Sequence, residues 1–397
     1  MNQRRLDLDW LRIIALGLLI LYHTGMFYVG WDWHVKSSRA GEAIEPLMEF
    51  LSPWRLALLF LISGAATRFL ADKMSGLAFT KARMVRLVPP LVLAIFVIVP
   101  PQTYYQVLEA VEAGLGPASA LDGFYLKYVT ASGQWCGPDE CIITPTYNHM
   151  WFVFYLVLYT LLVPFFAPFL RRLTPALDFL TRGPGLLIAP WLVMYVLRAT
   201  LLPIFGQTHF FINDFYLHAL YLFVFFLGFA LAKHQPFFDR CVKARWLALV
   251  LALGCWAAVQ GYYAFFAAQE SAPPDWLRLV MRGAYTLQAW SAIVAALGFA
   301  HRHLSNTDNR LRRVLTEAIF PFYLVHQTII VVAGHHLDAL SLPLWQEVAL
   351  LISITIAGCW LFYALAKRIS WLRLWAGLSP KEKEVGMTPR PALVQGE

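Results

Sequence analysis

Apolar residues recur along this chain in long stretches, separated by shorter polar or charged segments. A helix of about 20 apolar residues, at 1.5 Å per residue, crosses the hydrocarbon core of a bilayer, which is about 30 Å thick. The pattern therefore predicts an all-α, polytopic transmembrane bundle. Its ten predicted spans are residues 8–30, 47–71, 86–105, 148–170, 184–203, 215–233, 246–268, 282–300, 315–337 and 345–367.

These spans form one membrane domain, which we place at residues 1–378, and we find no internal repeat and no soluble domain. The charged, Pro-containing segment 379–397 is predicted to be a disordered cytoplasmic tail. The first span opens with Asp7 and Asp9, and no small-residue cleavage pattern follows it. We therefore interpret it as a retained helix and not as a signal peptide.

The composition excludes a water-soluble fold, because 59% of the 397 residues are hydrophobic, 14% are charged and the mean hydropathy is +0.57. Soluble domains have about 25% charged residues. The net charge of +8 is compatible with nucleic-acid binding, but the distribution of the charge argues against it. Basic residues gather at the N-terminus and in every second loop, which by the positive-inside rule predicts that both termini are cytoplasmic.

The longest segment outside the spans, residues 106–147, contains several Gly and Pro residues and is predicted to be an extracytoplasmic loop with turns. Cys136 and Cys141 lie in this loop, where a disulfide would persist. The sequence leaves two alternatives open for this pair: a disulfide bond or two unpaired thiols.

Ionisable residues inside a span cost from about 2.5 kcal/mol upward, so each one is a functional candidate. Arg12 and His23 are eleven residues apart in the first span. That spacing is about three helical turns plus 20°, so both side chains leave one face, about 16 Å apart along the axis. They could line a passage; alternatively, Arg12 snorkels to headgroups and His23 bonds to a neighbouring helix.

A second pair of candidates, Arg83 and Arg86, lies one helical turn apart just before the third span. Two guanidinium groups in this arrangement suit phosphate, which arginine binds bidentately. Basic residues at this position are also what topology requires, so this alternative stays open.

Further polar residues lie deep in the spans or near their outer ends. His149 and Trp151 begin the fourth span at the outer interface, where Trp is common. His326 lies near the middle of the ninth span and needs a partner or a function. Arg55 and Arg198 lie toward the outer ends of their spans, where they could simply snorkel.

No phosphate-binding loop, HExxH zinc motif, GxSxG elbow or CxxC pair occurs in the sequence. We therefore expect neither a metal nor a nucleotide-hydrolysis site. The adjacent pair His335 and His336 has no further metal-ligand pattern around it, and we interpret it as part of a loop.

Five segments together resemble the membrane acyltransferase family 3 over nearly the whole chain. They contain an Arg-x10-His pair, Phe-Leu-Ile-Ser-Gly, Arg-x-x-Arg-Leu-x-Pro, His-Met-Trp-Phe and Tyr-Leu-Val-His. These are residues 8–12 with His23, then 60–64, 83–89, 149–152 and 323–326. Residues 33–37, which include His34, resemble the branch of periplasmic glucan succinyltransferases.

One position departs from the family pattern. Many members carry an acid six residues before the Ser-Gly pair, and Ala57 stands there in this chain. The glucan branch resembles this chain in having an arginine two residues earlier, which maps to Arg55 and could meet a carboxylate or another negative charge. Glu49 is then the nearest acid in the second span that could orient His23.

The resemblance implies an O-acyltransferase of the bacterial inner membrane. Its donor would be cytoplasmic acyl-CoA, either succinyl-CoA or acetyl-CoA, and its acceptor a hydroxyl of a periplasmic glucan or another extracytoplasmic carbohydrate. His23 would be the general base. For the whole protein we expect no metal cofactor and no nucleic-acid partner. The acyl-CoA phosphates would meet Arg12, Arg83 and Arg86. The acceptor side would include His34, Arg55, His149, Trp151 and His326.

The rival interpretation is a transporter or flippase for a glycan or a lipid-linked sugar, in which the polar stripe lines a path and no bond changes. The sequence also leaves open whether the acyl group passes through an acyl-histidine, and whether the chain forms a homo-oligomer.

Overall fold

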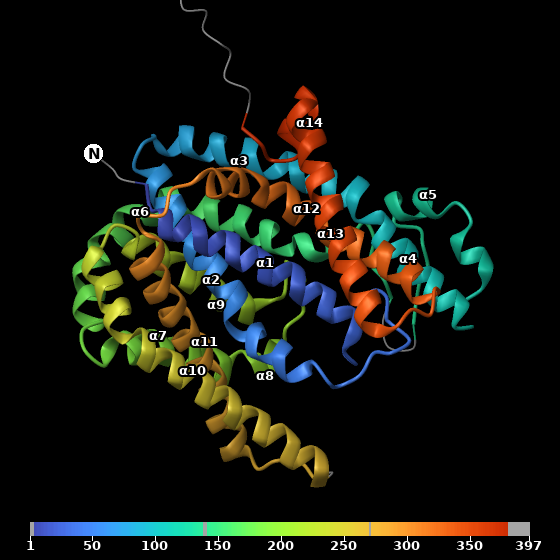
Figure 1. Ribbon diagram of the computed structural model, residues 1–397. Helices are drawn as coiled ribbons and strands as arrows, with labels where there is room; N and C mark the ends of the chain where they lie inside the picture. Colours follow the sequence, from blue (N-terminus) through green and yellow to red (C-terminus); the bar gives the residue numbers. More distant parts are fainter. Residues whose placement is uncertain (1–3, 138–140, 270, 380–397) are drawn as a thin grey trace, which may run out of the picture.

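Helices make up most of the computed structural model, which describes residues 4–137, 141–269 and 271–379 (Figure 1). Within these residues there is no β-strand, so the predicted all-α fold is confirmed. The main helices are α1 (Leu6–Tyr28), α2 (Glu45–Ala71), α3 (Gly76–Leu93), α4 (Pro100–Glu112), α6 (Trp151–Leu180), α7 (Gly185–Thr200), α9 (Phe215–Leu231), α10 (Gln235–Gln269), α11 (Asp275–Leu304), α12 (Arg310–Asp338) and α13 (Leu344–Arg368).

Each of the ten predicted spans corresponds to a helix or to one continuous helical run. Nine of them are long and apolar enough to cross a membrane among the residues that the structure describes. The tenth is the shorter apolar helix α9, which has 17 residues. Short helices complete the chain: α5 (Phe124–Val129), α8 (Leu202–Phe205), α14 (Ser370–Trp375) and the 3-10 turns Ala118–Leu121 and Asn148–Met150. The chain is a multi-pass membrane protein.

Several helices extend beyond the predicted ends. Helix α3 begins at Gly76 and not at residue 86, α6 continues to Leu180, and α10 begins at Gln235. The predicted ends mark where the apolar stretch stops, whereas backbone hydrogen bonding continues into the charged flanks. The predicted tail begins at Ser379, and residues 380–397 lie outside the described part of the chain.

The third span is bent where prolines interrupt it. A π-helical turn, Ala94–Ile98, joins α3 to α4. Because Pro100 has no N–H, the carbonyl of Phe96 lacks its helical donor and accepts instead from the Tyr125 hydroxyl at 2.9 Å. Two neighbouring carbonyls also accept from hydroxyls: that of Ile95 from Tyr128 at 2.9 Å, and that of Ile98 from Thr328 at 2.7 Å. The bend thereby fixes α4 against α12.

Many charged residues pair with each other at one end of the bundle. This end also holds the start of the N-terminal helix, and we call it the basic end. Asp72, after α2, accepts from Arg68, Arg171 and Lys233 at 2.6–2.8 Å. Burial raises the pKa of Asp72, but these three hydrogen bonds outweigh it and lower the pKa to about 2. Asp178 forms a similar centre with Arg182, His234 and Arg240. That this end faces the cytoplasm stays a prediction.

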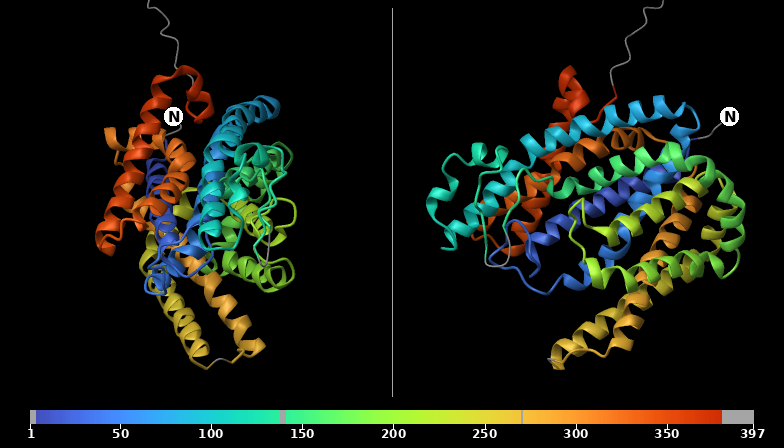
Figure 2. Two further views of the ribbon diagram at one scale, coloured as in Figure 1. Left: turned by 90° about the vertical axis from the view of Figure 1, so that its right-hand side faces the viewer. Right: turned by 180° about the vertical axis from the view of Figure 1, so that it is seen from behind.

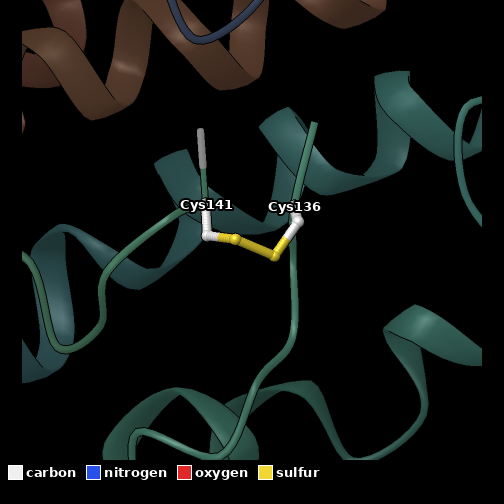
Figure 3. The surroundings of a disulfide bond; sticks show 2 residues. All are labelled: Cys136 and Cys141. Carbon is white, nitrogen blue, oxygen red and sulfur yellow. A yellow bond between two sulfur atoms is a disulfide. The ribbon is translucent and has the colours of Figure 1, made fainter. Parts of the chain in front are cut away.

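The long loop at the opposite end contains α5 and a disulfide. Cys136 and Cys141, which the sequence left open, are joined by a disulfide bond (Figure 3). The indole of Trp135, beside Cys136, donates to the carbonyl of Ala120 at 3.0 Å. These contacts hold the loop against itself beside α4.

Two glycines allow α2 and α9 to cross with their backbones in contact. A Cβ atom on Gly64 would lie 1.9 Å from the carbonyl oxygen of Phe225. A Cβ atom on Gly228 would lie 2.0 Å from the carbonyl oxygen of Leu61. Small residues are the usual means of close approach in membranes. Gly64 ends the Phe-Leu-Ile-Ser-Gly run, so this motif has a packing role.

Helices α10 and α11 form a hairpin whose joined ends project from the rest of the bundle (Figures 1 and 2). Helix α11 packs on α1, α2 and α7, whereas α10 contacts mainly α11. The hairpin therefore forms one side of the space beside α2.

The α2–α9 crossing generates a stability prediction. We expect Gly64→Ala and Gly228→Ala each to cost about 1–3 kcal/mol, because the added methyl group meets backbone that cannot rotate away. Thermal unfolding in detergent measures the effect. Gly254→Ala in α10 is the matched control, since a Cβ there meets nothing within 4 Å. Equal midpoints for all three variants would contradict the close crossing.

Candidate functional site

Two parallel helices, α1 and α12, are joined at two levels. At the basic end, Arg312 donates to Asp9 at 2.6 Å. Fourteen residues further along each helix lie His23 and His326, which is about 21 Å along the axis. Equal spacing on parallel helices brings the two imidazoles to the same depth. Their rings stack with centroids 5.0 Å apart and an angle of 4° between the planes.

The hydrogen bonds of the two rings assign their protons. Nδ1 of His326 lies 2.8 Å from the carbonyl oxygen of Tyr323, which can only accept, so this nitrogen carries the hydrogen. In a neutral ring, Nε2 of His326 is then an acceptor. It lies 2.8 Å from Nδ1 of His23, which must therefore donate. The remaining nitrogen, Nε2 of His23, keeps its lone pair.

His23 is also the accessible member of this pair. His326 is completely buried, at 0% exposure, whereas His23 is only partly buried. No protein hydrogen bond to Nε2 of His23 is present in the described part of the chain. A neutral imidazole with an accessible lone pair and an oriented ring is suited to accept a proton.

A third imidazole, His149, packs edge-on against His326 with ring centroids 5.3 Å apart. Its Nε2 donates to the carbonyl of Leu324 at 3.1 Å, and its Nδ1 accepts from the amide of Gln102 at 3.3 Å. The hydroxyl of Tyr323 donates to the backbone carbonyl of His149. His149 therefore uses both ring nitrogens in holding the 3-10 turn before α6 against α12.

Gln102, which the sequence analysis did not select, is the centre of a buried amide network. Its carbonyl oxygen accepts from Asn148 and Gln327 at 3.0 Å each, and its amide donates to Thr328 at 2.7 Å. Gln102 follows the proline bend and is 0% exposed. A glutamine directly after two prolines inside an apolar span is the sequence signal that would have found it, since a polar group there needs partners.

The structure does not bring Glu49 to His23. The Glu49 carboxylate accepts from Gln260 of α10, and the hydrogen-bond partner of His23 is His326. Arg55 is 3% exposed, and its guanidinium carbon lies 3.6 Å above the ring of Tyr22, the neighbour of His23. Arg55 therefore lies beside the histidine pair.

Trp151 and His34 approach the site from two other directions. The Trp151 ring packs on Phe60 of α2 and Tyr221 of α9, with centroids 6.3 and 5.7 Å apart, and so links α6 to these helices. His34 lies in the loop after α1, where its Nδ1 donates to Gln106 at 3.0 Å. Burial lowers the pKa of His34, although the bond to Gln106 opposes the shift.

Nearer the basic end, Arg12, Arg83 and Arg86 form a cluster of like charges. Their charges lie close enough to act on one another. Nε of Arg83 is buried without a partner. No hydrogen bond or ion pair joins these three to a protein acceptor among the described residues, in contrast to the paired arginines at Asp72 and Asp178. Three guanidinium groups in this state suit a polyphosphate.

The described residues contain no group of three or more His, Cys, Asp or Glu side chains that could hold a metal ion. The side chains gathered at His23 are a base, an orienting imidazole and a nearby arginine.

Comparisons with known proteins identify the family of the chain. The family model described as an acyltransferase domain, that of acyltransferase family 3, matches residues 5–364. The chain is similar to Glucans biosynthesis protein C of Escherichia coli strains K12, O1:K1 / APEC and O139:H28. Each is 27% identical over 162 residues, covering 40% of this chain and 38% of the relative. The match thus spans well under half of each relative. No solved structure matches the chain.

The proton assignment can be measured independently of any activity. In protein labelled with ¹⁵N-histidine, we expect the His23 signal of a ring with hydrogen on Nδ1 and a bare Nε2, identified by its loss in His23→Ala. His326→Ala removes the acceptor, so His23 should then show a mixture of both tautomers. His303→Ala, an exposed histidine on α11, should leave the His23 signal unchanged. A hydrogen on Nε2 of His23 in the unaltered protein would refute the assignment.

Proposed function

This chain belongs to the membrane acyltransferase family 3, and from that premise we propose that it moves an acyl group across a bilayer. The donor is cytoplasmic acyl-CoA, and the acceptor is a hydroxyl of a periplasmic glucan or a related extracytoplasmic carbohydrate. The observation that carries the proposal is the oriented His23, whose Nε2 has no hydrogen-bond partner among the residues that the structure describes. Membership of an acyltransferase family favours this over the transporter alternative.

In the proposed reaction, Nε2 of His23 removes the proton of the acceptor hydroxyl, and the hydroxyl oxygen attacks the thioester carbonyl carbon. The new C–O bond forms, the C–S bond breaks, and the proton on His23 passes to the departing thiolate. General-base help of this kind contributes typically about 10²- to 10⁴-fold. No other protein group has to gain or lose a proton overall.

His326 has a positioning role in this scheme. Its bond to His23 fixes the ring, and its own Nδ1–H ends on the carbonyl of Tyr323, which cannot take a proton onward. The pair therefore orients the base and does not conduct protons away. Many family members have an acid at the position of Ala57, and that acid could orient the histidine. In this chain, His326 takes the orienting role.

The donor would enter from the basic end. The phosphates of acyl-CoA are proposed to bind to Arg12, Arg83 and Arg86, for which the described part of the chain offers no acceptor. Arg12 and His23 are about 16 Å apart along α1, which is of the order of an extended pantetheine arm. The charged nucleotide can thus stay on its own side while the thioester reaches His23.

The acceptor would enter from the opposite end, past the loop that holds Trp33 and His34. The Trp33 ring lies 6.4 Å from that of His23, as measured between centroids. Aromatic and amide side chains around His34 and Gln106 suit a carbohydrate. The similarity to proteins named for glucan biosynthesis supports a glucan as acceptor. The bacterial inner membrane is the location that we propose with it.

Replacement of the base tests the proposal. His23→Ala in proteoliposomes should lower glucan-dependent release of free thiol from acyl-CoA by about 10²-fold or more, because the hydroxyl then loses its proton acceptor. Thiol release and the acyl mass added to the glucan are measured together. His303→Ala is the control. Near-normal transfer by His23→Ala would eliminate the base.

Removal of the arginine pair tests donor binding. We expect Arg83→Ala with Arg86→Ala to raise the KM for acyl-CoA by roughly 10- to 100-fold and to change kcat little, because bonds to charged groups contribute about 1.5–3 kcal/mol each. Arg172→Ala, an exposed arginine at the same end, should leave KM unchanged. An unchanged KM in the double variant would refute the phosphate role.

A further inference from the structure

A cavity of about 270 Å³ opens between α1, α2, α7 and the α10–α11 hairpin, and on α1 it is lined by Tyr22, the residue before His23. It lies on the side of Tyr22 and not on the path proposed for acyl-CoA. The side chains that matter for its chemistry are Tyr22, Glu49, Ser52, Arg198, Tyr263 and Tyr285. From the sequence alone, Arg198 could simply snorkel to the membrane surface. In the structure, the Arg198 side chain lines this cavity.

Arg198 is held in place by tyrosines. Its guanidinium carbon lies 3.7 Å above the ring of Tyr285, and Nη1 donates to the hydroxyl of Tyr216 at 3.2 Å. Its Nε is buried and has no partner. Stacking on an aromatic ring fixes the plane of the guanidinium group and leaves its edge available.

Arg55 repeats this arrangement on α2. Its guanidinium stacks on Tyr22, a lining residue of the same cavity, and both Nε and Nη1 are buried without partners. The two arginines therefore leave three buried nitrogen atoms without a hydrogen-bond partner within the described residues. A buried donor without a partner is costly, so such groups are normally satisfied.

Neither arginine has a carboxylate partner. No ion pair involves Arg55 or Arg198 in the described residues, whereas Arg68, Arg240 and Arg312 are each paired with a carboxylate. Glu49, the acid that lines the cavity, is bonded to Gln260. Two cations inside a membrane span without a counter-ion are expensive, which points to a negative charge from outside the protein.

We propose that this cavity binds the anionic group of a substrate, with Arg198 and Arg55 as the residues that determine specificity for it. The inference rests on the proposed function and goes further, since it assigns a charge to the substrate. Tyr22 connects the two sites: it stacks under Arg55 and adjoins His23, with ring centroids 6.2 Å apart. An anion held here is thus tethered close to the reacting carbonyl.

The anionic group has two candidate sources with the same chemistry. It is either the terminal carboxylate of a dicarboxylic acyl chain or an acidic substituent on the carbohydrate acceptor. Both are small enough for about 270 Å³ and both match the planar fork of arginine. The donor and acceptor arms of the experiment separate them.

The donor arm compares succinyl-CoA with butyryl-CoA, which have four acyl carbons each but differ in the terminal carboxylate. The acceptor arm compares a neutral glucan oligosaccharide with the same oligosaccharide carrying a phosphate ester. We expect Arg198→Gln to lower kcat/KM by about 10- to 100-fold for the anionic member of one arm only. Loss in the donor arm assigns the acyl chain, and loss in the acceptor arm assigns the carbohydrate.

Two variants serve as controls. Arg278→Gln, at the same end of the bundle but paired with Asp275, should keep the preferences of the unaltered protein. Glu49→Gln removes the one negative charge that lines the cavity and should strengthen the preference for the anionic member. An equal fall for charged and neutral substrates in Arg198→Gln would overturn the proposal, because it would indicate a structural role alone.

Direct binding separates this inference from the proposed function. Succinate itself should bind to the purified protein, more weakly by about 10-fold or more in Arg198→Gln, whether or not any thioester is consumed. Succinate binding without any turnover would support the anion site and refute the acyltransfer scheme. Turnover with unchanged anion preference and unchanged succinate binding in Arg198→Gln would refute the anion site and leave the acyltransfer scheme standing.

Discussion

The hydrogen bond between His23 and His326 is the contact on which the account depends. It joins two helices inside a membrane protein, at a depth where a free imidazole N–H would be costly. His326 donates in turn to the backbone carbonyl of Tyr323, which can only accept. The two hydrogen bonds together therefore place the hydrogen of His23 on Nδ1 and leave Nε2 without one. The geometry of the bundle thus sets the chemistry of one atom.

Much of the surrounding structure serves to hold this contact. The Asp9–Arg312 pair aligns α1 and α12 at the basic end, and the Gln102 network fixes α12 against the bent third span. The bend itself follows from Pro100, since the carbonyls it frees accept from side-chain hydroxyls. Close crossing of α2 and α9 at Gly64 brings Arg55 and Phe60 to the same region.

The sequence predicted the helices well, because about 20 consecutive apolar residues have few alternatives to a membrane span. It predicted their ends less well, as at α3 and α6, where helices continue into charged flanks. His23, Arg12 and His326 were selected because ionisable residues in spans are rare. Their contacts were harder to predict, since spacing along one helix does not say which helix faces it.

The equal spacing of Asp9 to His23 and of Arg312 to His326, fourteen residues in each case, is a signal that could have paired α1 with α12. Without it, Glu49 was the natural candidate to orient His23, and the structure instead places its carboxylate on Gln260. The sequence suggested a negative charge at Arg55, but the cavity that Arg198 lines could not be predicted from it. It needs Arg55 and Arg198, from helices far apart in the chain, together with tyrosines from three further helices.

The central claim is that His23 acts on a thioester whose nucleotide remains at the basic end. The most direct measurement is an experimental structure with a non-cleavable thioether analogue of acyl-CoA. The account predicts that the phosphates contact Arg83 and Arg86. It also predicts that the carbon in the place of the thioester carbonyl faces Nε2 of His23 across a gap that fits one hydroxyl oxygen, with that oxygen about 3 Å from both atoms. An analogue whose acyl end lies away from His23, or whose phosphates avoid both arginines, would contradict it.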